Sequence, residues 1–331
     1  MIFKSPFAAK IRSTGRYLPE RVVTNEELTQ FPQYLAKVIK EKTGVSARRY
    51  AAADESTSDL ASQAAKACLV KGEVDPDEID AIILATSSPD QLQPPTAARV
   101  QTRLGASRAF AFDINAVCSG SVYGMYLGDC LIRAGLCKKV MVIGAEIYSR
   151  FLNHKDFATC PYFGDGAGAV LLEREEDGKA GIILGTLHTD GNGADLISVP
   201  AGGSKRPGWE VTQRQEFYFR MQGREVYDFA VIRGSEVINE CLFNSGFSAE
   251  DIKCVLAHQA NENILREISK RTGIPLDKFF INLYYYGNTA AASVLIALDE
   301  AIDGGRLKKD DLIMLVAFGG GLSWGAILLR M

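Results

Sequence analysis

The sequence predicts an α/β fold made of two duplicated halves. Short apolar runs alternate with segments in which apolar residues recur at helical spacing. Three segments of the first half return in the same order in the second half. The chain has 331 residues, 47% of them hydrophobic, which suffices for a large core and roughly two domains. We therefore divide it into an N-terminal half, residues 1–175, and a C-terminal half, residues 176–331.

Buried strands are predicted where short apolar runs end in turn residues. These runs cover residues 81–88, 109–114, 139–146 and 169–174. Helices are predicted over residues 55–72 and 119–135, because apolar residues recur there every three to four positions. The glycine run at 317–325 suits a tight turn between two further core strands. Apolar strands that alternate with helices are typical of a sheet whose two faces are both covered.

The internal repeat is the main evidence for duplication. The three matching pairs of segments are 77–88 with 250–261, 112–121 with 280–293, and 132–144 with 302–319. In the first pair, acidic residues and an isoleucine precede a strand. In the second pair, a strand leads through a tight turn into a helix. The third pair shares the pattern Ile-x-x-Gly-x-x-Lys-Lys before a strand. Three matches in one order indicate two copies of one fold.

Cys118, His258 and Asn288 are candidate site residues because each follows a predicted strand. Cys118 and Asn288 lie in corresponding strand-to-helix turns of the two halves, and His258 follows an early strand of the second half. Ligands of α/β folds collect beyond the carboxyl ends of the strands. We therefore expect the three side chains to meet in one pocket between the halves.

Each of these residues also has an ordinary structural explanation. The thiolate of Cys118 would be a nucleophile, and the helix that follows it favours negative charge, but a buried structural cysteine fits equally well. His258 can act as acid, base or hydrogen-bond donor, although a lone histidine is usually a satisfied core residue. The Asn288 carboxamide can donate to an oxyanion, or it can cap a helix.

The composition argues against several classes of protein. The formal net charge of −3 gives no support for binding to nucleic acid. No apolar run approaches the roughly 18 residues of a membrane span. Lys4, Lys10 and Arg12 interrupt the N-terminal segment, so we expect a cytoplasmic protein. The seven cysteines form no Cys-x-x-Cys pair and there are three histidines, so neither a disulfide framework nor a metal site is expected.

Five motifs lie in a fixed order along the chain: DINAVCSGS, FGDGAGAVLL, HQANENIL, YYGNTAAASVLIALDEA and AFGGGLSWGAILL. Together they resemble the β-ketoacyl-acyl carrier protein synthase III family of thiolase-like condensing enzymes. The resemblance extends from STGRYLPERVVTNEEL to the C-terminus. It implies a five-layered α/β/α/β/α thiolase-like fold, a homodimer, and an acyltransferase of the ketosynthase type. Such enzymes serve fatty-acid synthesis and related lipid metabolism.

The resemblance also implies a role for each candidate residue. Cys118 would match the nucleophile that takes an acyl group from a thioester. His258 and Asn288 would match the pair that stabilises the enolate formed when a malonyl thioester loses CO2. Gly320 and the amide of Cys118 would match the oxyanion hole, and Phe318 the aromatic residue beside the leaving CO2. The substrates would be an acyl-CoA or acyl-carrier protein and malonyl-carrier protein or malonyl-CoA, with no metal or other cofactor.

Several substrate-contacting positions depart from the family's pattern. Val38 stands where the family has a Trp that stacks on the adenine of coenzyme A, and Lys42 stands where it has an Arg. Phe157 replaces a second adenine-stacking Arg. We nevertheless expect Val38 and Phe157 to contact the substrate, together with Gly223 and Asn261.

Two positions that normally help to dock the acidic carrier protein are also changed. Asn263 replaces an Arg and Asp228 replaces a Lys, which removes attraction for an acidic partner. Arg266, Lys205 and Arg206 are candidates to substitute for them. We therefore expect an intact condensing core with an unusual acyl-CoA or acyl-carrier thioester as donor, rather than the acetyl-CoA of housekeeping fatty-acid synthesis.

Three other interpretations are also compatible with the sequence. One is an acyltransferase on the same fold that passes the acyl group from Cys118 to a hydroxyl or an amine. Another is a non-catalytic partner subunit of a heterodimer, and a third is a hydrolase. The segment 87–100, which contains three prolines, is either a loop that shapes the acyl pocket or a surface connection.

Overall fold

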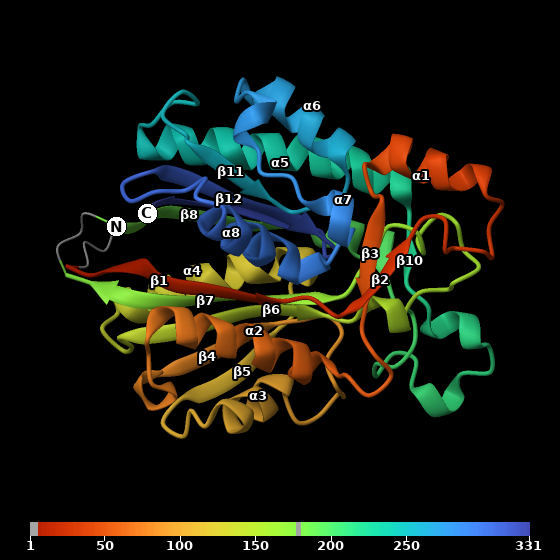
Figure 1. Ribbon diagram of the computed structural model, residues 1–331, viewed down its shortest axis with the longest axis horizontal. Coiled ribbons are helices and arrows are strands. Elements are labelled where there is room, and N and C mark those ends of the chain that lie inside the picture. Colours follow the sequence, from red (N-terminus) through yellow and green to blue (C-terminus); the bar gives the residue numbers. More distant parts are fainter. Residues whose placement is uncertain (1–5, 177–179) are drawn as a thin grey trace.

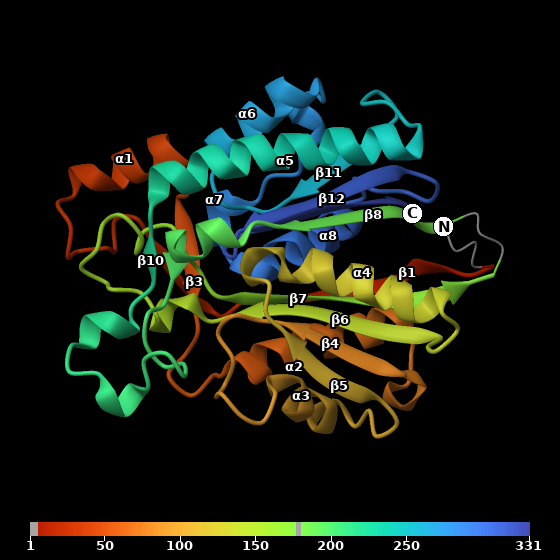
Figure 2. The ribbon, with the colours of Figure 1, turned by 180° about the vertical axis from the view of Figure 1, so that it is seen from behind.

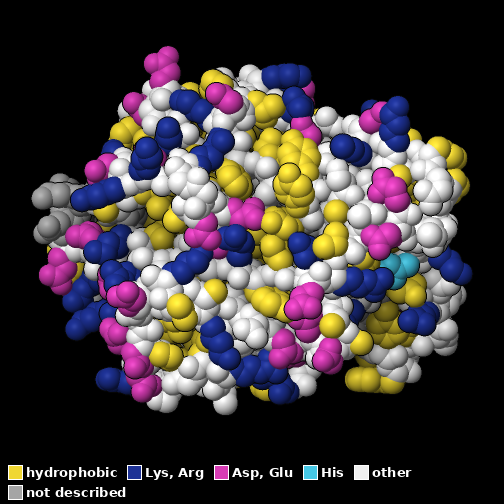
Figure 3. Space-filling view, viewed as in Figure 1, with side chains coloured by type: hydrophobic (Ala, Val, Ile, Leu, Met, Phe, Trp, Pro, Cys, Tyr) yellow, Lys and Arg dark blue, Asp and Glu magenta, His cyan; other side chains and the backbone are white. Residues whose placement is uncertain are grey.

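The structure is a computed structural model that describes residues 6–176 and 180–331. Its strands and helices alternate and stack in layers, as expected (Figure 1). The face seen in Figure 3 carries both acidic and basic side chains, with a group of hydrophobic side chains near its upper centre. Among the described residues, no helix is both long enough and apolar enough to cross a membrane.

The first sheet is built from strands of the N-terminal half. In order of hydrogen bonding, the strands described are β1 (Ala8–Tyr17), β7 (Gly166–Glu175), β6 (Lys139–Glu146), β4 (Ala81–Ala85) and β5 (Phe110–Ile114). β6, β4 and β5 are parallel, whereas β7 is antiparallel to both β1 and β6. The four strands predicted from apolar runs are all present, although β4 ends three residues earlier than the expected 88.

The second sheet repeats this arrangement with strands of the C-terminal half. Its order in the described chain is β8 (Gly181–Thr189), β13 (Ser323–Arg330), β12 (Leu312–Gly319) and β11 (Cys254–Ala257). β13 is antiparallel to both neighbours and β12 is parallel to β11, as in the first sheet. Phe279 bridges Val255 of β11 in parallel and so takes the place of β5. The two duplicated halves are therefore confirmed, while the domain boundary at residue 175 stays a prediction.

Helices form three layers around the two sheets, which gives the expected five-layered architecture (Figures 1 and 2). One outer layer holds α2 (Thr57–Gly72) and α3 (Thr96–Leu104), the middle layer α4 (Gly120–Arg133) and α8 (Ser293–Asp303), and the other outer layer α5 (Gly223–Ser245) and α6 (Glu262–Thr272). Each layer has its own cluster of buried apolar side chains. In β6, Val140 and Val142 face the middle layer, whereas Met141 and Ile143 face α2. This two-sided burial explains why the strands are continuously apolar.

Shorter elements gather at one end of the layers, on the right of Figure 1. They are β2 (Arg21–Thr24) paired with β3 (Ala47–Tyr50), β9 (Ile197–Ser198) paired with β10 (Arg220–Met221), and the helices α1 (Tyr34–Thr43) and α7 (Leu283–Tyr286). The strands β5, β6, β11 and β12 finish at this same end. The shorter elements therefore surround the place where the candidate site residues were expected.

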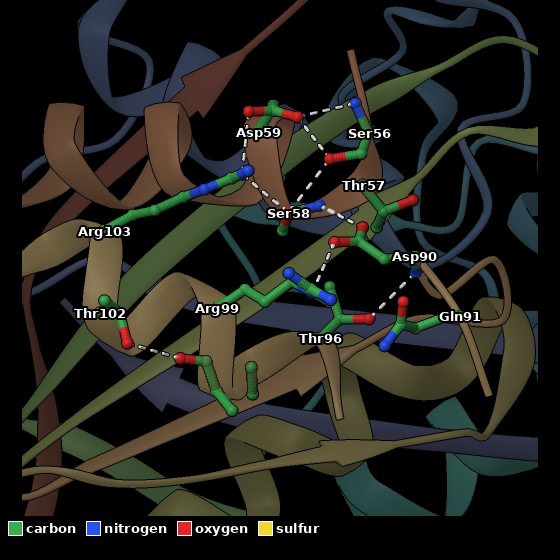
Figure 4. Close-up of polar contacts among 12 residues, drawn as sticks. Ser56, Thr57, Ser58, Asp59, Asp90, Gln91, Thr96, Arg99, Thr102 and Arg103 are labelled. Atoms are coloured by element: carbon green, nitrogen blue, oxygen red, sulfur yellow. Dashed lines mark hydrogen bonds and ion pairs between the residues drawn. The ribbon is translucent and has the colours of Figure 1, made fainter. Parts of the chain in front are cut away.

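Asp90 anchors the proline-containing segment 87–100 to two helices (Figure 4). Its carboxylate accepts the backbone N–H of Ser58 at the start of α2, at 2.9 Å, and lies 3.6 Å from Nε of Arg99 in α3. Its own N–H donates to the hydroxyl of Thr96 at 3.1 Å. The last five residues of the segment belong to α3, so only its first part is a loop, and that part is tied down at Asp90.

Candidate active site

A cavity of about 560 Å³ lies where the carboxyl ends of β5, β11 and β12 meet. Cys118, His258 and Asn288 all line it, although they are far apart in the sequence. Phe318 and Gly319 of β12 line it as well. The structure therefore brings together the three residues that were expected to share a pocket between the halves.

Cys118 lies in a strained turn between β5 and α4. The preceding residue, Val117, has φ of 47°, a left-handed conformation that β-branched residues rarely adopt. Its N–H donates to Oδ1 of Asn115 at 3.2 Å, and a 3₁₀ turn over Val117–Ser119 then leads into α4. Cys118 is 7% exposed. The turn thus places the thiol at the wall of the cavity and away from bulk water.

Burial raises the pKa of the Cys118 thiol well above its usual range, and the nearby Glu146 carboxylate adds to the rise. The N-terminus of α4 favours negative charge at this place, but the net shift of the Cys118 pKa is upward. The raised pKa favours the neutral thiol over the thiolate in the resting protein.

The second half repeats the same turn around Asn288. Ala290 has φ of 45°, and its N–H donates to Oδ1 of Asn288 at 2.8 Å. A 3₁₀ turn over Ala290–Ala292 then leads into α8. Because the carboxamide oxygen is held in this way, the amide NH2 is the end left to donate into the cavity. This NH2 group donates no hydrogen bond to any acceptor within residues 6–176 and 180–331.

His258 follows β11 and is 2% exposed. Its Nδ1 lies 2.7 Å from Oγ of Ser293, and its backbone N–H donates to the carbonyl of Val316 at 2.8 Å. The Phe318 ring meets the imidazole edge-on, with ring centroids 5.5 Å apart. Burial lowers the pKa of His258 to about 3, so the imidazole is neutral at ordinary pH. A neutral imidazole with so low a pKa is a weak base and a suitable hydrogen-bond donor.

Gly319, rather than Gly320, is the glycine packed against the nucleophile. A Cβ added at Gly319 would lie 2.8 Å from the Cβ of Cys118, so no larger residue fits there. A Cβ added at Gly320 would instead meet Val117 and Ile197, at 3.3 and 3.4 Å. The role of the Gly320 N–H in an oxyanion hole stays a prediction.

Exposed residues of α1, α5 and α6 that line the cavity mark its mouth; Lys42, Gly223 and Asn263 are among them. Gly223 and Asn261, both expected to contact the substrate, line the cavity here. Asn263 donates from Nδ2 to the carbonyl of Lys42 at 2.8 Å, and so ties α6 to the end of α1. Lys42 itself also lines the mouth.

Val38 and Phe157 do not line this cavity in the described part of the chain. Val38 is half-buried on α1. The Phe157 ring packs edge-on against Phe31, with centroids 5.2 Å apart. Their contact with a substrate stays a prediction.

Two of the three basic residues suggested as carrier-docking substitutes are already engaged in ion pairs. Arg266 pairs with Glu262, and Arg206 pairs with Glu216 at 2.8 Å. Lys205 is exposed. Partnered arginines offer less attraction to an incoming acidic protein than free ones do.

Glu146 is a feature of the site that was not predicted from the sequence. This last residue of β6 is fully buried, and its carboxyl group accepts the Ser87 N–H at 3.1 Å and the hydroxyl groups of Thr86, Ser87 and Ser88. Burial raises its pKa to about 7. An acidic residue at the end of an otherwise apolar strand was the available signal.

Aromatic rings form the wall of the site beside Cys118. Tyr148, Phe163 and Phe219 pack on one another with centroids 4.8 to 5.4 Å apart, in the same buried cluster as Cys118. Phe163 and Phe219 face the cavity. These rings limit the space next to the thiol.

Metal binding and a bound cofactor were not expected from the sequence. In the part of the chain that the structure describes, no group of three or more His, Cys, Asp or Glu side chains is arranged to hold a metal ion. The expectation that the reaction needs no metal or cofactor stays a prediction.

Comparisons with known proteins point to one family. Residues 112–191 match the family described as 3-Oxoacyl-[acyl-carrier-protein (ACP)] synthase III, and residues 242–331 match its C-terminal part. The chain is 43% identical over 328 residues to the Beta-ketoacyl-[acyl-carrier-protein] synthase III of Rhodospirillum centenum, which covers 98% of this chain and 99% of that protein.

Solved structures agree with this result. The 3-oxoacyl-[acyl-carrier-protein] synthase III of Aquifex aeolicus VF5 superposes with a TM-score of 0.90 and 41% identity, covering 98% of this chain and 100% of that one. The priming β-ketosynthase from the R1128 polyketide biosynthetic pathway superposes with a TM-score of 0.89 and 26% identity, covering 98% and 96%.

Proposed function

Because the chain belongs to the 3-oxoacyl-[acyl-carrier-protein] synthase III family, we propose that it condenses an acyl thioester with a malonyl thioester, giving a β-ketoacyl thioester and CO2. The observation that carries the proposal is the shared cavity of Cys118, His258 and Asn288. A thiol nucleophile beside two neutral hydrogen-bond donors is suited to a decarboxylative Claisen condensation. The reaction so proposed uses no metal or cofactor.

In the first half-reaction, Cys118 takes the acyl group. Its sulfur attacks the carbonyl carbon of the donor, a new C–S bond forms, and the donor's C–S bond breaks. The thiol proton ends on the departing sulfur. Because burial raises the pKa of Cys118, proton loss accompanies the attack rather than preceding it. The backbone N–H groups of Cys118 and Gly320 would hold the transient oxyanion.

In the second half-reaction, the malonyl thioester loses CO2 and its electrons move onto the thioester oxygen. The resulting enolate accepts hydrogen bonds from the His258 ring and from the Asn288 NH2 group. The enolate carbon then attacks the acyl carbonyl on Cys118, and a C–C bond replaces the C–S bond. The released thiolate takes up a proton from solvent, which restores the resting thiol.

We further propose a donor other than acetyl-CoA, delivered as an acyl-CoA or acyl-carrier thioester. This proposal depends on the replaced adenine-stacking positions, Val38 and Phe157, and on the neutral Asn263 and acidic Asp228 at the carrier-docking positions. The malonyl thioester would likewise arrive on a carrier protein or on CoA.

A homodimer is the proposed working form. Support comes from β5, an edge strand of the first sheet whose Phe110 is half exposed. Light scattering of the purified chain would measure the mass of the particle, and a single-chain mass would refute the dimer.

Intact-mass spectrometry tests the function directly. The protein is incubated with a panel of acyl-CoAs and acyl-carrier thioesters, with and without a malonyl thioester, and C118A serves as the control. We expect an adduct on Cys118 that disappears as CO2 and β-ketoacyl product form, and its mass identifies the donor. An adduct that persists with the malonyl thioester but leaves with an alcohol or amine would show an acyltransferase instead. No adduct from any donor would indicate a non-catalytic subunit.

A further inference from the structure

Ser293, the first residue of α8, is a buried hydroxyl that contacts the ring of His258. Its Oγ lies 2.7 Å from Nδ1 of His258, 3.0 Å from the carbonyl oxygen of Ala290, and 3.4 Å from the backbone N of Gln259. Ser293 is 2% exposed, so water does not compete for these contacts. The hydroxyl is therefore held among three fixed polar groups.

A hydroxyl has one proton to donate and can accept two hydrogen bonds. The Gln259 N–H can only donate, so it occupies an acceptor site of Ser293. The Ser293 proton then goes either to the carbonyl of Ala290 or to Nδ1 of His258. The Ala290 carbonyl already accepts the backbone N–H of Ser293, so it stays satisfied without the hydroxyl. The shorter of the two contacts, at 2.7 Å, is the one to His258.

The direction of this bond sets which ring nitrogen of His258 carries the proton. Burial keeps the imidazole neutral, so it has a single N–H. If Ser293 donates to Nδ1, the proton lies on Nε2, which has no protein partner among residues 6–176 and 180–331. In the opposite arrangement, Nε2 would present a lone pair to the cavity and would repel an enolate oxygen. Only the first tautomer gives His258 the role proposed for it.

The same turn also fixes the second donor. The Ala290 N–H holds Oδ1 of Asn288, which leaves the Asn288 NH2 group free. Ala290 and Ser293, at the start of one helix, thus orient the two groups that were proposed to bind one oxygen.

We propose that Ser293 is a positioning residue that donates its hydroxyl proton to Nδ1 of His258 and thereby keeps Nε2 protonated towards the cavity. This inference rests on the proposed condensation, whose malonyl half-reaction needs an Nε2–H donor. Ser293 touches no reacting atom in this scheme, and it acts only through His258.

The tautomer can be measured without any turnover. The chain has three histidines, so ¹⁵N-histidine labelling gives few signals, and loss of one set in H258A assigns His258. We expect an unprotonated Nδ1 and a protonated Nε2 from pH 6 to pH 8, with no titration in that range. In S293A, the Nδ1 signal should shift and both tautomers should appear. A protonated Nδ1 in the unmodified protein would overturn the proposal, whatever the reaction turns out to be.

Kinetics of the two half-reactions give the second test. In S293A, CO2 release should fall about tenfold or more, because one enolate donor is no longer held in the right form. Acylation of Cys118 should change less than about threefold, since it does not need that donor. S293T, which restores a hydroxyl group, should recover part of the loss.

Ser121 provides the matched control. It lies in the first turn of α4 and is fully buried, and its hydroxyl has no hydrogen-bond partner among residues 6–176 and 180–331. S121A should therefore leave both half-reactions unchanged. An equal loss in both half-reactions of S293A, with a lower melting temperature than S121A, would show a purely structural role and refute the proposal. Failure of condensation in the unmodified protein, with Nε2 protonated, would instead refute the function and leave the hydrogen bond established.

Discussion

Asn115 and Asn288 occupy the same position in two copies of one turn. Each side-chain oxygen accepts the N–H of the residue two places ahead, at 3.2 Å in the first copy and 2.8 Å in the second. The residues that donate, Val117 and Ala290, both have positive φ. Each turn then leads through a short 3₁₀ segment into a helix of the middle layer. The structural counterpart of Asn288 is thus Asn115, not Cys118.

The same turn places a different functional residue at the cavity in each half. In the first half, the residue after the strained position is Cys118, and Asn115 is exposed. In the second half, the equivalent of Cys118 is Ala291, and Asn288 faces the cavity instead. Because the turn geometry is shared, the nucleophile and the amide donor approach one cavity from corresponding places in the two halves.

The two asparagines give a matched pair of variants. N288A should lower CO2 release from a malonyl thioester by about 10²–10³-fold, since removal of one oxyanion donor costs that much. Acylation of Cys118 should persist, because it does not use the Asn288 NH2 group. N115A removes the corresponding hydrogen bond from the turn that carries Cys118, so it should slow the acylation of Cys118 but leave CO2 release within about twofold. Release of ¹⁴CO2 from a labelled malonyl thioester measures the effect of each variant. Equal losses in N288A and N115A would contradict the assignment of Asn288 as a hydrogen-bond donor to the enolate.

Glu146 predicts an unusual dependence of stability on pH. Its pKa rises from an ordinary 4.5 to about 7 because it is buried. A carboxyl group whose pKa is raised by folding stabilises the folded state at pH values below its pKa in the unfolded chain. That contribution is lost as the pH rises through its pKa in the folded protein. The free energy of unfolding should therefore fall by up to roughly 3 kcal/mol between pH 4.5 and pH 7 from this group.

E146Q should remove this dependence, because glutamine keeps the shape but does not titrate. Urea unfolding of both proteins at a series of pH values measures the difference. The variant should also react faster with iodoacetamide at Cys118 near pH 8, since the Glu146 carboxylate raises the pKa of that thiol. A parallel pH dependence of the two proteins would show that folding does not raise the pKa of Glu146.

Phe219 should limit the length of the acyl group. It faces the cavity and packs at 4.8 Å on Phe163, beside Cys118. F219A opens space next to the thiol, so longer straight-chain donors should gain about tenfold in acylation rate relative to short ones. Phe217, on the same loop but outside the cavity, supplies the control, and F217A should leave the preference unchanged. The test is the rate of Cys118 acylation by a series of donors of increasing chain length. An equal loss of rate for all donors would contradict the prediction that Phe219 limits acyl length.

The fold could be predicted because its signals are local. Strands buried on both faces are continuously apolar, and the duplication repeats short patterns such as Ile-x-x-Gly-x-x-Lys-Lys. Cys118 and His258 could be found because each follows a strand. Asn288 could be found because its segment repeats the pattern around Cys118, although the helix α7, and not a strand, precedes it. Ser293 and Glu146 could not be found, because their roles come from contacts that only the fold creates. Ser293 contacts His258, which lies 35 residues earlier in the sequence. Glu146 contacts Thr86 and Ser88, which lie 60 and 58 residues earlier. The raised pKa of Cys118 was missed for the same reason, since burial depends on every layer around it.

Asp228 should weaken the delivery of a substrate by an acidic carrier protein. It is exposed on α5, one residue from Tyr227 at the mouth of the cavity. D228K replaces repulsion with attraction, so kcat/KM for a malonyl-carrier protein should rise about tenfold at low salt and lose that gain as salt is added. Malonyl-CoA, which has no such protein surface, should show little change. D54K makes the same charge change at an exposed residue before α2 and should not alter kcat/KM. An increase in D54K as large as in D228K would mean that only net charge matters, and no increase in either would place the docking surface elsewhere.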